Sequence, residues 1–489
     1  MFSCETKQPQ EKAQKEPMML PAVNAPEINT KFGWLNSDTS YSIKDFKGKI
    51  VLLDFWTFGC INCQHILPDL KRLEQEYAQE LVVIGIHSAK FGSEKSSDKI
   101  KKAIEKFKVT HPVVNDADFT VWNSYAVNAW PTFVLINPDG KVVAQKSGEG
   151  FYAPIKQAID GLKQAYGDKI STKVFDFGKR EQIAGPLLFP SKIITDSKGH
   201  FYVSDSGHNR ILVLDENGKV IEIIGQGSEG NSNGSFADAS FNEPHGMALN
   251  ESKLYIADSK NNLIRIADLT TKTVATAAGS GKKGYYYFES KLNENVDPNS
   301  PWDLTIANNT LYIADAGNHQ ILKMDLATNA VFRLAGTGRE ALADGTFRES
   351  AFNQPSGICV SDNFLYVADP EASAVRRLDL KNNRVETLVG KGLFDFGDKD
   401  GKAGDALLQH CVGIEVQGDK LFIADTYNGK IKQLDLGKLE VTTFATGFNE
   451  PNDVLVSGDQ LWITDTNNHQ LIKLNLATGK KQVVNLTGI

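Results

Sequence analysis

Two cysteines three residues apart are the part of this sequence whose residue types and spacing could do chemistry. Cys60 and Cys63 follow an apolar, strand-like run that begins at Val51, and they precede a segment with helical periodicity. This arrangement places Cys60 at a helix N-terminus, where free N–H groups and the helix dipole stabilise a thiolate. A structural zinc site would need four ligands, and the sequence has no second cysteine pair. We therefore expect a redox pair without metal or cofactor, with Cys60 as the exposed nucleophile and Cys63 as the resolving thiol.

The residues around the cysteines resemble the thioredoxin superfamily. Asp54 lies six residues before Cys60, where thioredoxins carry a buried acid, and Pro68 lies five residues after Cys63, where they carry a helix-kinking proline. The resemblance implies that Asp54 assists proton transfer at the resolving cysteine. Gly59 departs from the pattern, because thioredoxins usually have tryptophan there, and the dipeptide between the cysteines is Ile-Asn rather than Gly-Pro. That dipeptide tunes cysteine acidity and reduction potential, so the direction of electron flow stays open.

A second motif of the same superfamily lies further along the chain. Residues 125–137 resemble the strand that carries the thioredoxin cis-proline. The resemblance implies that Pro131 is cis, faces the cysteine pair and helps to hold a substrate chain in β-like contact. Trp130 beside it and Gly59 are the candidate substrate-binding residues.

Length, composition and charge narrow the function classes. A chain of 489 residues holds two or three domains, or one domain and a repeat array, and its hydrophobic content of 41% is ordinary for a globular protein. The net charge of −7 argues against nucleic acid or an anionic membrane as the main partner, and no run of about 20 apolar residues indicates a membrane span. Five cysteines are too few for a disulfide scaffold and are typical of a reducing compartment.

From about residue 183 onward, the sequence repeats. Six strand-like segments, spaced 40 to 57 residues apart, each end in aspartate: Asp205, Asp258, Asp315, Asp369, Asp425 and Asp465. Four short strands at such a period are typical of a β-propeller blade. Because the aspartate recurs in every unit, we interpret it as closing a strand-end turn rather than as a catalytic or metal-binding residue.

Positions that differ from unit to unit are better candidates for binding. Directly after the proline that opens the innermost strands stand Ser191, His245, Trp302, Ser356 and Asn452. We expect these residues to line the mouth of the propeller channel, and we single out His245, Trp302 and the nearby loop residue His410. The competing interpretation is that they merely fill the channel.

The repeats resemble NHL-repeat propellers, and the whole chain resembles NHL-repeat-containing proteins with an N-terminal thioredoxin-like domain. We predict a disordered segment (1–25), an α/β thioredoxin-like domain (26–166), a linker that could supply a propeller-closing strand (167–182) and an all-β, six-bladed NHL-type propeller (183–489). The animal members imply a cytoplasmic location. A redoxin-like lead-in favours a bacterial cell-envelope protein instead, if Cys4 marks a truncated lipoprotein signal.

Two functions from different classes fit these observations. The first is a thiol–disulfide oxidoreductase that acts on a protein disulfide or dithiol, with the propeller binding a protein or peptide partner. The second is a non-catalytic scaffold with a thioredoxin-like docking domain, which the unusual Gly59 and the Ile-Asn dipeptide favour slightly. NHL-type RNA binding would need a basic propeller face, which the acidic balance disfavours.

Overall fold

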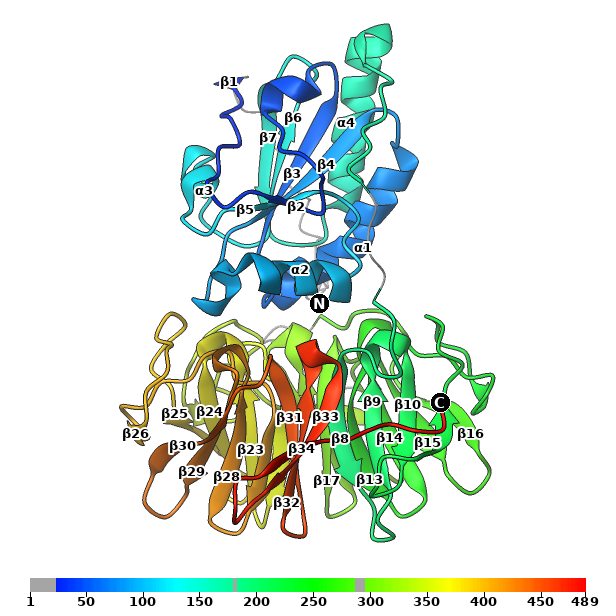
Figure 1. The fold of residues 1–489 in the computed structure, drawn as a ribbon, viewed down its shortest axis with the longest axis vertical. Helices are drawn as coiled ribbons and strands as arrows, with labels where there is room; N and C mark the ends of the chain where they lie inside the picture. The colour runs from blue at the N-terminus through cyan, green and yellow to red at the C-terminus, as the bar shows by residue number, and fades with distance from the viewer. Residues whose placement is uncertain (1–22, 179–182, 286–294) are drawn as a thin grey trace, which may run out of the picture. The chain divides into compact units, whose positions relative to one another are not determined.

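The computed structural model describes residues 23–178, 183–285 and 295–489 (Figure 1). The described residues form two compact units: the first contains residues 23–90 and 94–178, and the second contains Phe91–Ser93 and residues 183–285 and 295–489. Cys4 and nearly all of the segment predicted to be disordered lie outside the described residues. Within the described ranges, no helix is long and apolar enough to cross a membrane.

The described residues of the first unit form a seven-stranded mixed sheet with helices, the α/β architecture predicted for this half. The strand order is β1-β7-β6-β3-β4-β5-β2; β3 runs parallel to β4 and antiparallel to β6. The strands are β1 (Val23–Asn24), β2 (Trp34–Leu35), β3 (Ile50–Trp56), β4 (Leu81–His87), β5 (Val113–Asn115), β6 (Thr132–Ile136) and β7 (Lys141–Ser147). The helices are α1 (Ile61–Glu76), α2 (Ser97–Lys106), α3 (Thr120–Ser124) and α4 (Tyr152–Tyr166).

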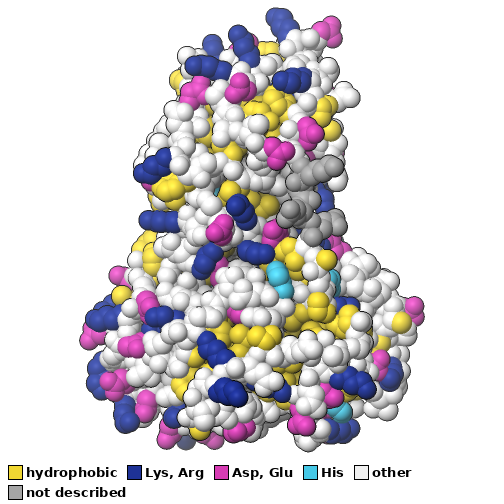
Figure 2. Space-filling view, viewed as in Figure 1, with side chains coloured by type: hydrophobic (Ala, Val, Ile, Leu, Met, Phe, Trp, Pro, Cys, Tyr) yellow, Lys and Arg dark blue, Asp and Glu magenta, His cyan; other side chains and the backbone are white. Residues whose placement is uncertain are grey.

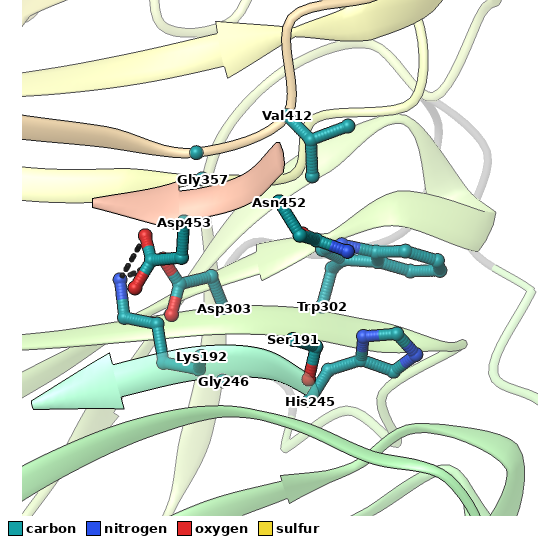
Figure 3. Close-up of a pocket in the computed structure, with 11 residues that line it drawn as sticks. Ser191, Lys192, His245, Gly246, Trp302, Asp303, Gly357, Val412, Asn452 and Asp453 are labelled. Carbon is teal, nitrogen blue, oxygen red and sulfur yellow. Dashed lines mark hydrogen bonds and ion pairs between the residues drawn. The ribbon is translucent and has the colours of Figure 1, made fainter. Parts of the chain in front are cut away.

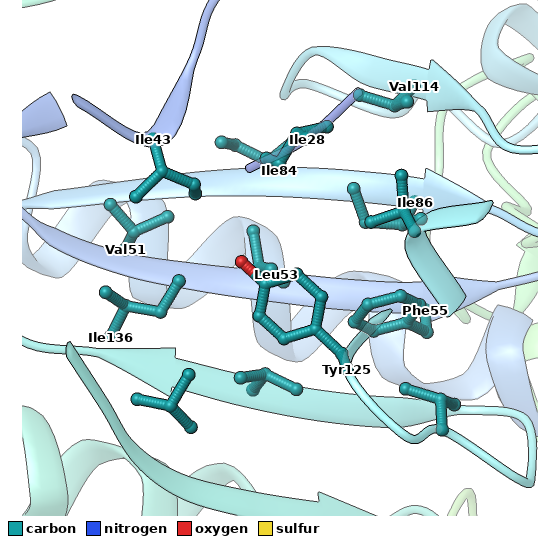
Figure 4. Close-up of a cluster of buried hydrophobic side chains, with 14 of the residues drawn as sticks. Ile28, Ile43, Val51, Leu53, Phe55, Ile84, Ile86, Val114, Tyr125 and Ile136 are labelled. Carbon is teal, nitrogen blue, oxygen red and sulfur yellow. The ribbon is translucent and has the colours of Figure 1, made fainter. Parts of the chain in front are cut away.

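Strand β3 is buried along its whole length and has a different role on each face. Val51, Leu53 and Phe55 belong to a cluster of buried side chains on one face of the sheet (Figure 4). Because successive side chains of a strand point to opposite faces, Asp54 lies on the other face with Trp56. The strand therefore supplies both the hydrophobic core and the acid predicted to serve the cysteines.

The described residues of the second unit form six antiparallel sheets, which are the six predicted propeller blades (Figure 1). Each innermost strand contacts the innermost strand of the next blade, and β31 contacts β8, so the ring is closed. From innermost to outermost strand, the blades are β8–β11 (Pro190–Thr195, Phe201–Asp205, Arg210–Leu214, Val220–Ile224), β13–β16 (Pro244–Asn250, Lys253–Asp258, Leu263–Asp268, Thr273–Ala278), β17–β20 (Pro301–Ala307, Thr310–Asp315, Gln320–Asp325, Val331–Ala335), β22–β25 (Ile358–Ser361, Phe364–Asp369, Ala374–Asp379, Arg384–Val389), β27–β30 (Ile414–Gln417, Lys420–Asp425, Lys430–Asp435, Glu440–Thr446) and β31–β34 (Pro451–Ser457, Gln460–Asp465, Gln470–Asn475, Lys481–Val483). Short strands β12 (Gly234–Ser235), β21 (Gly345–Thr346) and β26 (Gly401–Lys402) extend three of them.

The linker contributes no closing strand over its described part, residues 167–178. Instead, the Phe175 and Phe177 rings pack against Tyr41 of the first unit, with ring centroids 6.0 and 5.6 Å from it. The C-terminal residues return to the first blade, where Val220 N–H donates to the Thr487 carbonyl at 2.8 Å.

The repeated aspartates have a structural role that reaches further than the predicted turn. In each blade, one carboxylate oxygen accepts the N–H of a residue 16 or 17 positions earlier, in the segment that leads into the innermost strand. Asn449, for example, donates to Asp465 at 2.6 Å. The other oxygen of Asp465 accepts the Asn468 side chain of its own turn at 2.7 Å, so the aspartate also closes the strand-end turn, through a side chain rather than through the backbone.

In five of the six blades, the side chain of the residue after this turn joins its blade to the next one. Asn209 Oδ1 accepts the N–H of Glu243 at 2.9 Å, across from the first blade to the second. Asn262, His319 and Ser373 make the same bond in the following blades. Between the sixth blade and the first, His469 Nδ1 accepts the N–H of Phe189 at 3.1 Å. This last bond helps to close the ring.

Candidate functional site

The two cysteines lie where β3 ends and α1 begins. Cys60 is the N-cap residue of α1, with an extended backbone (φ −77°, ψ 118°), and Cys63 lies in the first helical turn. Cys60 is partly exposed, whereas Cys63 is completely buried, and both are free thiols. A thiol at a helix N-terminus is well placed to act as a nucleophile, because the unpaired N–H groups there favour a negative charge.

The surroundings of Cys63 favour its protonated form. Burial raises the pKa of the Cys63 thiol well above its usual value, and a hydrogen bond with the Cys60 side chain raises it further. The Asp54 charge acts in the same direction, while a hydrogen bond from the Thr57 backbone lowers the pKa. Before Cys63 can attack a disulfide, a neighbouring group must therefore take its proton.

Asp54 is a buried acid whose charge acts on the Cys63 thiol. The side chain is completely buried, and neither carboxylate oxygen has a hydrogen-bond partner among the described residues. Burial raises the pKa of Asp54 to about 7, against a smaller lowering by His111. At neutral pH, the carboxyl group is thus protonated in part of the molecules and ionised in the rest. This suits a group that accepts and returns a proton.

The strand of the predicted cis-proline begins as the sequence suggested. The Trp130–Pro131 peptide bond is cis. The Pro131 carbonyl accepts the N–H of Gly148 at 2.9 Å, and the Trp130 indole donates to the Ser88 carbonyl at 2.9 Å. The Trp130 ring also packs against Trp122, with centroids 4.6 Å apart. That Pro131 and Trp130 face the cysteine pair and touch a substrate stays a prediction.

The turn between β3 and α1 is held by two buried side chains from β4 and the segment after it. His87 Nε2 accepts the N–H of Phe58 at 3.3 Å, and burial lowers the pKa of His87 to about 3, so its ring is neutral. Gly59 is buried and donates its N–H to the Glu94 carboxylate at 3.0 Å. No sequence pattern distinguishes Glu94 from the other acids among the 60 acidic residues of the chain.

In the propeller, His245 and Trp302 come together near Ser191 and Asn452 at the innermost strands (Figure 3). Their rings are stacked, with centroids 4.1 Å apart and planes 27° apart. With Ser191 and Asn452 they line a small hollow of about 10 Å³. The structure thus brings together residues that the sequence placed at the channel mouth.

A charged cluster lies directly beside this hollow (Figure 3). Lys192 Nζ lies 2.8 Å from Asp303 Oδ2 and 3.3 Å from Asp453 Oδ1. Burial lowers the pKa of Lys192, but the two carboxylates outweigh it and leave the pKa raised. The carboxylates also accept backbone N–H groups of Ile193 and Ile358, so the cluster ties several innermost strands together.

Glycines at this hollow allow the innermost strands to approach one another closely. A Cβ atom on Gly413 would collide with the Asn452 carbonyl, and one on Gly246 would collide with the Asp303 backbone. A larger residue at either position would push the innermost strands apart.

His410 does not line this hollow. It has a positive φ of 50°, as do the residues that precede the opening proline in other blades. Its ring stacks on Tyr427 instead, with centroids 4.2 Å apart. Cys411 occupies the proline position of this blade, so the residue that corresponds to His245 and Trp302 is Val412.

Comparison with known proteins relates both halves of the chain to established families. Residues 48–142 match the thioredoxin-like family, residues 299–324 and 448–474 match the NHL repeat, and residues 354–373 match the LVIVD repeat.

Curated relatives share this combination over most of the chain. The chloroplastic protein SUPPRESSOR OF QUENCHING 1 of Arabidopsis thaliana is 38% identical over 451 residues, which cover 87% of this chain and 43% of the plant protein. NHL repeat-containing protein 2 of Gallus gallus is 38% identical over 474 residues, which cover 89% of this chain and 65% of the chicken protein. The chain thus spans less than two thirds of both relatives. The thiol-disulfide oxidoreductase ResA of Geobacillus thermodenitrificans is 30% identical over 126 residues, 25% of this chain and 68% of ResA.

Proposed function

Because the chain belongs to the proteins that join an N-terminal thioredoxin-like domain to NHL repeats, we propose that it is a thiol–disulfide oxidoreductase. Cys60 and Cys63 form its redox pair, and the propeller is its partner-binding module. The substrate is a protein disulfide or dithiol. A cytoplasmic location is part of the proposal.

The reaction follows from the different surroundings of the two thiols. The Cys60 thiolate attacks one sulfur of a substrate disulfide, and the other substrate sulfur leaves as a thiolate. Asp54 then takes the proton of Cys63, whose sulfur attacks Cys60 and expels the second substrate sulfur as a thiolate, and Asp54 returns the proton to it. The substrate gains two electrons, and the pair becomes a disulfide. In the opposite direction, the same steps oxidise a dithiol.

One observation carries this proposal: a buried carboxyl group with a pKa of about 7 acts on a buried thiol whose pKa is raised. A structural role offers no reason for an unpaired buried carboxylate, because its desolvation is not compensated by hydrogen bonds. Catalysis offers a reason for such a carboxylate, since a general base works best when its pKa lies near the working pH.

The propeller supplies the partner contacts in this proposal. The hollow lined by His245 and Trp302 offers an aromatic surface beside the Asn452 amide, a combination that suits a protein or peptide side chain. On the face of the propeller in Figure 2, basic and acidic side chains are interspersed rather than gathered into a basic patch. That distribution favours a protein partner over a nucleic acid.

The first experiment is equilibration of the full-length protein with glutathione buffers, followed by trapping of free thiols. A reduction potential near or below roughly −270 mV indicates a reductant, and one near roughly −120 mV indicates an oxidant. Cys63→Ser should accumulate a mixed disulfide through Cys60, and the double variant Cys60→Ser/Cys63→Ser should form none. If the wild-type cysteines form no disulfide at any ratio of oxidised to reduced glutathione, the chain is a scaffold instead.

A further inference from the structure

Glu94 buries a carboxylate next to the redox pair. Its side chain, in the short 3-10 helix η2 (Ser93–Lys95), is completely inaccessible to solvent. Oε1 accepts the N–H of Gly59 at 3.0 Å. Oε2 accepts the hydroxyl of Thr57 at 2.6 Å and the N–H of Lys90 at 2.9 Å. These three hydrogen bonds replace the water that a buried carboxylate loses, which makes burial of the charge tolerable.

Two of the three donors belong to the turn that carries both thiols into place. The Thr57 carbonyl faces the N–H of Cys60 at 3.4 Å. The Thr57 backbone also forms a hydrogen bond with the Cys63 thiol, which lowers the pKa of that thiol. Gly59 is the residue directly before Cys60. The carboxylate thus fixes the segment that contacts both the Cys60 backbone N–H and the Cys63 thiol.

We propose that Glu94 is a positioning residue of the Cys60–Cys63 pair and that its charge sets the balance between the dithiol and the disulfide. The inference rests on the proposed oxidoreductase function. A fixed negative charge beside the turn disfavours a second negative charge on the neighbouring sulfur atoms. Because a pair becomes more oxidising when its reduced form is stabilised, removal of the Glu94 charge should make this pair more oxidising.

Glu94→Gln in the full-length protein removes the charge and keeps the shape of the side chain. The glutamine oxygen can still accept two of the three donors. We expect the equilibrium with glutathione to shift about tenfold toward the dithiol, which corresponds to about 30 mV. Glu94→Asp keeps the charge and should restore part of the wild-type value. The control Glu105→Gln, a partly exposed acid paired with Lys102 on α2, should stay within about twofold of the wild type.

The reduction potential separates positioning from a merely structural role, because loss of fold stability alone lowers the melting temperature without moving the potential. A folded Glu94→Gln variant whose equilibrium constant stays within about twofold of the wild type overturns the inference while the oxidoreductase function stands. If Glu94→Gln does not fold, Thr57→Val removes only the hydroxyl contact. It should move the constant by at least about threefold, and an unchanged constant overturns the inference. A wild-type protein that forms no disulfide overturns both proposals.

Discussion

Replacement of Asp54 by asparagine should stabilise the thioredoxin-like domain, and the gain should grow as the pH rises. Burial raises the pKa of Asp54 from 3.8 to about 7 on folding, and no described residue donates a hydrogen bond to either oxygen. Between these two pKa values, the folded state binds more protons than the unfolded state. Each rise in pH therefore removes stability until the carboxyl group is ionised in both states, above pH of about 7.

The size of the effect follows from the pKa change. A rise of about three pKa units corresponds to a loss of about 4 kcal/mol at about pH 8, since each unit is worth about 1.4 kcal/mol. At about pH 5, only roughly 1 to 2 kcal/mol of this loss is present. Asparagine does not titrate, so the stability of Asp54→Asn relative to the wild type should increase by about 2 to 3 kcal/mol between these pH values.

Hydrogen exchange of β3 in increasing urea measures the stability of this domain within the full-length protein. Asp116→Asn is a matched control, because that equally buried carboxylate accepts hydrogen bonds from Ser88, Val121 and Trp122. It should lose stability, since an amide cannot replace both acceptor oxygens. A gain for Asp54→Asn that is equal at both pH values, or that shrinks at the higher one, would refute the reasoning.

Two further predictions concern the propeller. His469→Ala removes the acceptor of the Phe189 N–H, which should destabilise the ring closure by about 1–3 kcal/mol and accelerate hydrogen exchange in β8. Lys192→Met leaves the buried carboxylates of Asp303 and Asp453 without their cation, which should cost about 3–5 kcal/mol at neutral pH. That cost should fall in acid, because burial raises the pKa of both carboxyl groups and they become protonated there, as urea unfolding at two pH values can measure.

Exposed counterparts provide controls for both propeller variants. His200 pairs with Asp196 while partly exposed, and Lys31 pairs with Asp118 while largely exposed. His200→Ala and Lys31→Met should each change stability by less than about 1 kcal/mol. Unchanged exchange in β8 for His469→Ala would contradict a role in ring closure. A pH-independent loss for Lys192→Met would contradict the assignment of its cost to unpaired carboxylates.

Local sequence patterns predicted the secondary-structure elements and the positions of Cys60 and Cys63 at the start of a helix. The spacing of Asp54, Cys60, Cys63 and Pro131 is visible in the sequence because each residue has a fixed place on a strand or at a helix end. The blades were equally visible, since each repeats the same strands. The contacts between residues far apart in the chain, in contrast, were not visible in the sequence. Glu94 reaches Thr57 across 37 residues, and Lys192 reaches Asp453 across 261 residues, so both depend on how the fold closes.

The position of His410 shows a further limit of sequence reasoning. In five blades, a proline marks the start of the innermost strand and so fixes which residue follows at the channel mouth. In the fifth blade, Cys411 stands at the proline position, so the sequence does not mark the start of the innermost strand. Only the hydrogen bonds between neighbouring strands show which residue follows at the channel mouth. His410, which we predicted at the channel mouth, therefore does not occupy the position in its blade that His245 and Trp302 occupy in theirs.

The two units differ in whether their buried charged side chains have partners. This difference is relevant to function. In the propeller, the buried cations Lys192, Arg265, Arg376 and Lys432 each lie within ion-pair distance of a carboxylate. In the thioredoxin-like domain, Asp116 is satisfied by three donors, whereas Asp54 has no hydrogen-bond donor among the described residues. An uncompensated carboxylate lowers stability, so stability gives no reason to keep it at this position. Proton transfer to and from the buried Cys63 thiol, as in the proposed reaction, does give a reason, because burial raises the pKa of Asp54 to about 7 beside a thiol whose pKa is also raised.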